Sequence, residues 1–154
     1  MSREILFKAK RLDNNAWVTG YYIYHIKRTL CPFGDRLRPE DKQHAIMKDG
    51  FSDWNMPRNT VHYDIDPSTL CQFTGLLDID GRRIWENDII ECKSDKYHFQ
   101  SQVEWDNKCA GFIIQDSEHS AVGLDAITKN GIYKNVRVIS NIFDEGKDEL
   151  EKGD

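Results

Sequence analysis

The 154-residue sequence lacks long apolar runs and has only four prolines. No segment approaches the roughly 20 apolar residues that a membrane-spanning helix needs. The first twelve residues carry charges among their apolar positions, which is not typical of a signal peptide. The four cysteines lie far apart in the chain, and without a targeting signal we expect them to be free thiols. The sequence therefore predicts a cytoplasmic protein that does not enter a membrane.

The sequence also lacks the short motifs that most often carry catalysis or bind metals. It has no Cys-x₂₋₄-Cys pair and no closely spaced histidines for zinc. It has no Gly-x-Ser-x-Gly nucleophile motif and no phosphate-binding or dinucleotide-binding glycine motif. We therefore expect no cofactor, no stoichiometric metal ion and no catalytic residues, and the chain is predicted not to be an enzyme.

Short alternating segments, separated by turn residues, are what the sequence does contain. Residues 4–11 and 16–26 alternate around the turn-forming Asp13-Asn14-Asn15, which predicts a β-hairpin. Further apolar segments follow, with turn residues about every 8–12 positions, a spacing typical of small barrels and sandwiches.

The predicted fold is mainly β. It consists of an N-terminal β-hairpin unit and a small SH3-like barrel or sandwich containing residues 73–143, followed by a short C-terminal helical tail at 145–152. We expect a single domain over residues 1–154, with possible sub-units at 1–65 and 66–144.

Residues 27–57 have the weakest pattern of the chain. Prolines at positions 32 and 39 interrupt any long element. A short strand at His44–Met47 and one helical turn at Pro39–Gln43 are the elements that we expect there, and the structure of the rest is not predicted.

The strand predicted at Trp17–Ile26 has apolar or aromatic side chains on both faces. Such a strand either lies between two layers or meets another subunit. Because so short a chain covers one of these faces more easily than both, we predict a homo-oligomer with Trp17, Tyr22 and Tyr24 as candidate interface residues. The alternative is that residues 27–57 fold back over the second face.

The segment from Cys71 to Ile90, CQFTGLLDIDGRRIWENDII, is rich in acidic residues and raises the question of a calcium site. An EF-hand loop needs an oxygen ligand at position 1, Gly at position 6 and a bidentate Glu at position 12. Aligning Gly81 to position 6 puts Leu76 at position 1 and Asn87 at position 12, so the pattern fails at both ends. A hairpin turn, in which Asp80-Gly81 supplies the positive φ, is the favoured interpretation.

A nuclease-like cluster is the second interpretation of these acids. Two-metal hydrolysis needs carboxylates that converge on ions about 4 Å apart. Asp78 and Asp80 are expected at the tip of the hairpin, whereas Glu86 and Asp88 are expected at its base. We therefore favour structural roles, with aspartate side chains that accept hydrogen bonds from backbone N–H groups in the turns.

Nucleic-acid binding would require basic residues interleaved with aromatics on one face of a sheet. Residues 1–50 carry 10 Lys/Arg against 6 Asp/Glu, whereas residues 51–154 carry 11 against 20. The candidates near Trp17 and Tyr21–Tyr24 are Lys8, Lys10, Arg11, Lys27 and Arg28, with a second small spot at Arg82 and Arg83. The net charge of −5 opposes a phosphate backbone, so we expect weak binding at most.

A central motif runs from Asp66-Pro67-Ser68-Thr69 through QFTGL, Asp78 and Gly81 to IWENDII. This motif resembles the YopX proteins of phages and prophages. The opening segment ILFKAKR…WVTGYYI and the closing segment VRVISNIFD resemble the ends of the same family, so the likeness covers nearly the whole chain. Departures from the family pattern are Trp85 for Tyr or Phe, Asn87 for Gly, and Ser140 for Gly. Asn tolerates positive φ better than most residues, which suits the corner at Asn87.

This resemblance implies a phage setting but no chemistry, because these proteins have no assigned activity and no known catalytic residues. The motif residues, which we expect to be structural, are Asp66, Pro67, Gln72, Thr74, Gly75, Asp78, Gly81, Trp85, Glu86 and Asp88. The leading prediction is a non-enzymatic phage accessory protein that binds a host or phage protein. The alternative is a nucleic-acid-binding module, and a metal-dependent hydrolase is third. The ligand, the stage of infection and the oligomer size are not predicted.

Overall fold

The computed structural model describes residues 2–116, 118, 120–127 and 132–144. Twelve strands and three short 3₁₀ helices lie in these residues, so the prediction of a mainly β protein is confirmed. The predicted helical tail at 145–152 lies outside the described residues. The chain forms two compact units, Met1–Phe73 and Thr74–Asp154, and each is described by itself below.

The N-terminal unit is built on one antiparallel sheet with the strand order β4-β3-β2-β1-β5. Its elements are β1 (Phe7–Lys10), β2 (Trp17–Ile26), η1 (Pro39–Asp41), β3 (Lys42–Asp49), β4 (Thr60–Asp64), η2 (Pro67–Thr69) and the first part of β5 (Cys71–Leu77). β1 and β2 form the predicted hairpin, with Phe7 opposite Gly20. Asn15 in its turn has a φ of 56°, which asparagine tolerates better than most residues.

Residues 27–57 do not cover the second face of β2. They contain β3, which pairs with β2 along its edge, so that Tyr22 lies opposite Ile46 and Ile26 lies opposite Lys42. The predicted strand is therefore present but longer, and η1 forms at the predicted helical turn. Edge pairing satisfies the main-chain groups of β3 directly, and this adds a strand to the sheet rather than a second layer.

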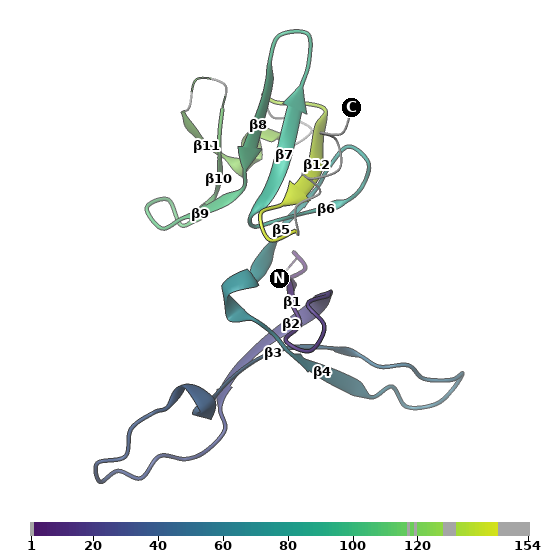
Figure 1. The fold of residues 1–154 in the computed structure, drawn as a ribbon. Helices are drawn as coiled ribbons and strands as arrows, with labels where there is room; N and C mark the ends of the chain where they lie inside the picture. Colours follow the sequence, from purple (N-terminus) through teal and green to yellow (C-terminus); the bar gives the residue numbers. More distant parts are fainter. Residues whose placement is uncertain (1, 117, 119, 128–131, 145–154) are drawn as a thin grey trace, which may run out of the picture. The chain divides into compact units, whose positions relative to one another are not determined.

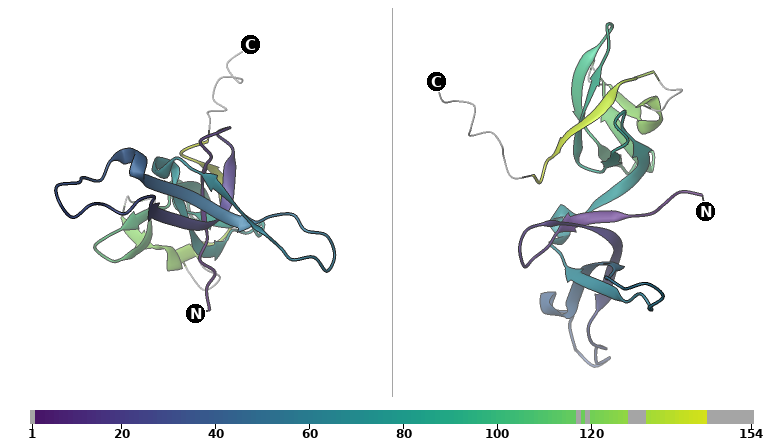
Figure 2. Two further views of the ribbon diagram at one scale, coloured as in Figure 1. Left: turned by 90° about the horizontal axis from the view of Figure 1, so that it is seen from below. Right: turned by 90° about the vertical axis from the view of Figure 1, so that its right-hand side faces the viewer.

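Two long loops leave β3 from its opposite ends (Figures 1 and 2). Residues 27–38 connect β2 to η1 and β3, and residues 50–59 connect β3 to β4. The core beneath the sheet is correspondingly small. Its main cluster of buried residues consists of Ala9, Val18, Ile46 and Ile65.

The C-terminal unit contains more and shorter strands. Its elements are the second part of β5, β6 (Arg83–Trp85), β7 (Asp88–Lys93), β8 (His98–Gln102), β9 (Glu104–Asp106), β10 (Gly111–Gln115), β11 (Ala121–Gly123), η3 (Leu124–Ile127) and β12 (Val136–Asn141). β5 pairs with β6, while the other strands form two three-stranded sheets of order β12-β7-β8 and β11-β10-β9.

The sheets of this unit are open, so of the two expected architectures, a barrel or a sandwich, the barrel is wrong. The chain from His98 to Asp106 is divided at Val103 into β8 and β9. β8 pairs with β7, whereas β9 pairs with β10, and a gap remains between β8 and the end of β10. The SH3-like character of this unit stays a prediction.

The core of the C-terminal unit is larger than that of the N-terminal unit. Nine buried residues form it, including Ile84, Ile90, Val103 and Ile114. At its border, the ring of Tyr133 meets the ring of Phe99 edge to face, with the ring centres 5.0 Å apart. This packing supplies a rigid base for the turns that carry the family motif.

Candidate functional site

The acidic turn at the centre of the motif is organised by Asp78, which is only 8% exposed. One carboxylate oxygen accepts the backbone N–H groups of Asp80 and Arg82 at 2.9 and 2.8 Å. The other accepts the N–H of Val138 at 3.1 Å. Gly81 has a φ of 79°, as the turn requires. The Asp78 carboxylate therefore fixes the turn and links it to β12.

The corner at Trp85–Asp88 is organised by a second buried carboxylate. Asp88 is 1% exposed, and its oxygens accept the backbone N–H of Trp85 and the side-chain amide of Asn141, each at 2.8 Å. The Asn141 amide also donates to the carbonyl of Glu86 at 3.3 Å. Asn87 has a φ of 65°, so this substitution for glycine keeps the corner.

Asn141 was not among the predicted motif residues, although it lies in the closing segment that resembles the family. It is separated from Asp88 by 53 positions, so no local pattern links the two. Ser140 is not among the described residues with positive φ. Its position therefore does not need a glycine conformation.

Other motif residues lie in the turn before β5 and within β5 itself. Asp66 accepts the N–H of Ser68 at 2.9 Å, and Pro67 begins η2. Thr74 donates its hydroxyl to the carbonyl of Ile84 at 2.7 Å, which holds β5 against β6. Gly75 follows with a φ of 88°, and Gln72 lies opposite Phe7 in the β1–β5 pair.

These contacts bear on the metal and hydrolase hypotheses. The carboxylates of Asp78 and Asp88 accept backbone and side-chain N–H groups, and Asp80 pairs with Arg137 at 3.3 Å. Within the described ranges, no group of three or more His, Cys, Asp or Glu residues is placed to hold a metal ion. The geometry supports structural roles for the acidic motif.

The three candidate interface residues on β2 differ in their surroundings. Tyr22 is half-buried against the small core, and its hydroxyl lies 2.6 Å from Nδ1 of His44. The ring of Trp17 lies beneath the ammonium groups of Lys8 and Lys10, at 4.7 and 4.9 Å from the ring centre. Tyr24 is 48% exposed and stacks against His44, with the ring centres 4.8 Å apart. Tyr24 is therefore the most accessible of the three.

The loop at residues 27–38 is ordered by Arg28, which the sequence analysis considered only as a candidate for nucleic-acid binding. Arg28 donates to Asp35 at 2.6 Å and to Asp41 at 2.7 Å. The guanidinium, together with the N–H of Cys31, lowers the pKa of Asp35 from 3.8 to about 2. Hydrogen bonds from Arg28 and from the N–H of Arg38 likewise lower the pKa of Asp41. These ion pairs explain how a segment with little apolar pattern keeps a defined shape.

The loop at residues 50–59, which we call the aromatic arm, exposes three large apolar side chains. Trp54 is 96% exposed, Phe51 is 91% exposed and Met56 is also exposed. The N–H of Met56 donates to the carbonyl of Asp53 at 3.2 Å, and Asn55 has a φ of 59°. The tip is therefore a hydrogen-bonded turn that presents the indole to solvent.

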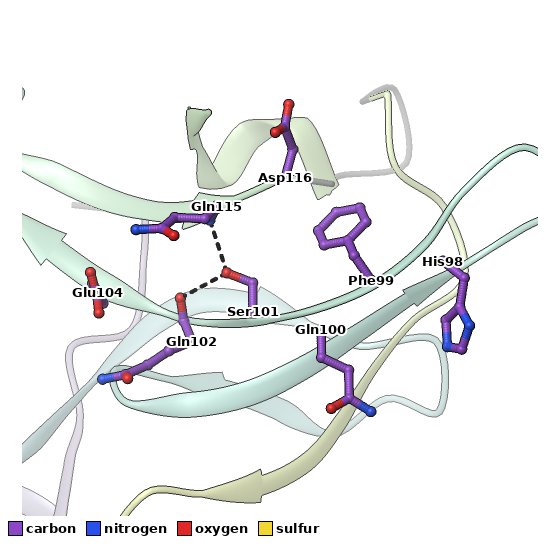
Figure 3. A pocket seen from close by; sticks show the side chains of 8 residues that line it. All are labelled: His98, Phe99, Gln100, Ser101, Gln102, Glu104, Gln115 and Asp116. Atoms are coloured by element: carbon purple, nitrogen blue, oxygen red, sulfur yellow. Dashed lines mark hydrogen bonds between the residues drawn. The ribbon is translucent and has the colours of Figure 1, made fainter. Parts of the chain in front are cut away.

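A cavity in the C-terminal unit lies in the gap between β8 and the end of β10 (Figure 3). Its volume is about 370 Å³, and glutamine, serine and acidic side chains form much of its lining. Across it, the N–H of Gln115 donates to the hydroxyl of Ser101 at 2.8 Å. No sequence pattern predicts this gap, because it depends on where β8 ends and β9 begins.

The fold defines a small β-protein in which two buried carboxylates, Asp78 and Asp88, hold the turns of the motif and the most exposed aromatic side chains lie on loops. A family model described as "YopX protein" matches residues 7–147, and the chain belongs to the YopX family. The resemblance seen in the sequence is thereby confirmed. None of the curated proteins compared with the chain matches it. In the described part of the chain, no helix has the length and apolar character needed to cross a membrane.

Proposed function

We propose that this YopX-family chain is a non-enzymatic accessory protein of a phage or prophage that binds another protein in the bacterial cytoplasm. The observation that carries the proposal is the aromatic arm, residues 50–59, with Trp54 at its tip. An ordered turn that holds a tryptophan almost fully in solvent is costly in water, and partner binding removes that cost.

The energetics favour the arm as an anchor for a protein partner. Full burial of one large apolar side chain stabilises a complex by about 1.5–3 kcal/mol. Tryptophan is enriched among the few residues that dominate binding energy at protein interfaces. Phe51 and Met56 flank it in sequence, so one pocket on a partner can receive more than one apolar group.

The charges around the arm point to an apolar protein pocket rather than to a polyanion. Lys48 and Arg58 are balanced by Asp49 and Asp53. Arg58 pairs with Asp49 at 3.1 Å across the base of the arm. A surface that binds nucleic acid by charge would carry an excess of cations instead.

The test is a capture experiment with the full chain from infected bacterial cells. The wild type is compared with Trp54→Ala and with the matched control Leu12→Ala, which removes an exposed apolar side chain at a different turn. We expect a protein whose recovery falls about tenfold with Trp54→Ala, as the loss of roughly 1.4 kcal/mol requires. The same protein, once purified, should bind the wild type and the Leu12 variant alike. Equal recovery with both variants contradicts the arm proposal.

A nucleic-acid module is the second candidate, favoured by the two ammonium groups over Trp17. Those ammonium groups occupy a ring face that a stacked base would need. We expect binding to generic DNA no tighter than about 10⁻⁴ M near physiological salt. Fluorescence anisotropy at two salt concentrations measures this. Micromolar affinity that falls with salt and with Lys8→Glu would establish the second candidate instead.

Self-association through β2 is a further part of the proposal. Tyr24 is exposed, as are Tyr21 and Ile26 on the same strand. Light scattering should give the wild type a mass above the 18.0 kDa of one chain, and Tyr24→Lys should lower it. Tyr22→Lys should instead unfold the N-terminal unit, because Tyr22 packs against its core. A wild type of monomer mass at high micromolar concentration contradicts self-association.

A further inference from the structure

The gap in the C-terminal unit is an incomplete β-ladder, which we call the seam. β8 is the edge strand of its sheet, and β10 pairs with β9 only as far as Ile113, opposite Glu104. Beyond this point β8 and β10 are joined through the hydroxyl of Ser101, which accepts the N–H of Gln115 and donates to the carbonyl of Gln102 at 3.2 Å. A side chain thus spans the space that main-chain pairing would otherwise fill (Figure 3).

The main chain of β8 faces the seam at alternate residues. Val103 donates to Asp88 at 2.9 Å, and Tyr97 accepts from Ser94 at 2.8 Å, so these odd-numbered positions direct their main-chain groups toward β7. In an antiparallel pair the intervening residues direct theirs the other way. The N–H and C=O groups of His98 and Gln100 therefore point away from β7, toward the seam.

Side chains on both faces of β8 border this edge. Figure 3 shows Phe99 and Ser101 on the side of β10, whereas His98, Gln100 and Gln102 project to the other face. An extended segment laid along β8 would alternate its own side chains between these two faces. The cavity of about 370 Å³ falls within the range of small binding sites, which begins near 300 Å³.

The acidic residues at the seam favour a ligand with a cationic side chain. Glu104 lies at the end of the seam where β9 pairs with β10. Asp116 follows the last residue of β10, across the seam from β8. Residues 74–154 carry 10 Lys/Arg against 17 Asp/Glu, net −7, whereas residues 1–73 carry 11 against 9, net +2. A cationic side chain entering the seam would meet favourable potential both locally and from the whole unit.

We propose that the seam binds an extended peptide segment carrying an arginine or lysine. The peptide main chain pairs with His98 and Gln100, and its cationic side chain reaches Glu104. Addition of a strand to an open sheet edge is a recurrent mode of peptide recognition. This site is separate from the aromatic arm, and Trp54→Ala should leave it unchanged.

The test is a titration of the isotope-labelled full chain, followed by amide NMR shifts. The probe is the synthetic peptide Ac-Thr-Arg-Thr-Arg-Thr-NH₂, and the control is the same peptide with glutamate in place of arginine. We expect the arginine peptide to shift the amides of His98, Gln100 and Gln115, and the glutamate peptide to leave them unmoved. Absence of these shifts, or equal shifts with both peptides, overturns the proposal.

Two variants separate main-chain pairing from charge. Gln100→Pro removes an N–H that faces the seam, at an edge position where proline is tolerated, and should abolish binding. Glu104→Gln should weaken binding about tenfold, the effect of losing one charge-assisted hydrogen bond. Asp95→Asn makes the same change of charge on an exposed residue outside the cavity and should have little effect. If Asp95→Asn weakens binding as much as Glu104→Gln, general electrostatics explains the binding and the site is not the seam.

Discussion

The two units of the chain differ in the size of their buried clusters and in where their most exposed aromatic side chains lie. The main cluster of buried apolar residues has four members in the N-terminal unit, which also has two long loops and one buried carboxylate, Asp41. The corresponding cluster of the C-terminal unit has nine members, and two buried carboxylates, Asp78 and Asp88, lie in its turns. The family motif lies mainly in the second unit, where Asp78 and Asp88 fix its turns. The most exposed aromatic side chains, Phe51 and Trp54, lie in the first.

This difference teaches that the recognisable motif and the binding surface need not coincide. Turns held by buried carboxylates tolerate little substitution, because each lost acceptor leaves a buried N–H without a partner. The aromatic arm, whose ion pair between Arg58 and Asp49 lies on the surface, leaves its apolar side chains exposed to a partner. The motif therefore identifies the scaffold, and function has to be sought on the loops and in the seam.

The largest expected effect comes from shortening one core residue in each unit. Ile90→Ala should destabilise the C-terminal unit by about 4 kcal/mol, because a fully surrounded cavity cannot collapse. Ile46→Ala should cost the N-terminal unit about 2 kcal/mol, since a thin core relaxes around the lost atoms. Both residues are fully buried, so the comparison is matched. Hydrogen exchange of the amides in each unit gives the two free energies, and equal costs would contradict the contrast drawn between the cores.

The second effect concerns the corner of the motif. Asp88→Ala should destabilise the C-terminal unit by about 3 kcal/mol, because the N–H of Trp85 and the amide of Asn141 lose the carboxylate that accepts their hydrogen bonds. Asp80→Ala is the control, since Asp80 is exposed and its ion pair with Arg137 is worth about 0.5 kcal/mol or less. Urea unfolding followed by tryptophan fluorescence measures both. A cost below about 1 kcal/mol for Asp88→Ala would mean that water replaces the lost acceptor.

The same contrast explains what the sequence could predict. The hairpin turn at Asp78–Gly81 and the corner at Asn87 depend on local backbone chemistry, so both could be placed from residue type alone. The pairing of Asp88 with Asn141 could not, because the partners are 53 positions apart. The division of residues 100–105 at Val103, which opens the seam, depends on competing strand partners rather than on side-chain pattern.

The third prediction is that the order of the loop at residues 27–38 depends on pH. The pKa of Asp35 is lowered from 3.8 to about 2 by Arg28, so its contribution to loop order is complete above pH 3.8 and is lost as the pH falls toward 2. The amide shift of Cys31, whose N–H donates to Asp35, should follow this titration. In Arg28→Ala the midpoint should move toward 3.8. An unchanged midpoint would show that the backbone N–H groups, and not the guanidinium, hold the pKa down.

The smallest expected effect on stability is also the one that most sharpens the comparison. Trp54 is 96% exposed, so Trp54→Ala removes a large side chain that makes little contact within the fold. Surface substitutions of this kind usually change the free energy of unfolding by no more than about 0.5 kcal/mol. Urea unfolding of the full chain, followed by circular dichroism because the substitution removes a fluorophore, measures the change. If the free energy of unfolding is nearly unchanged and partner capture is lost, the indole contributes to binding but not to the stability of the fold. A cost above about 1 kcal/mol would instead mean that the indole packs against the chain in solution, and the arm would then be part of the scaffold.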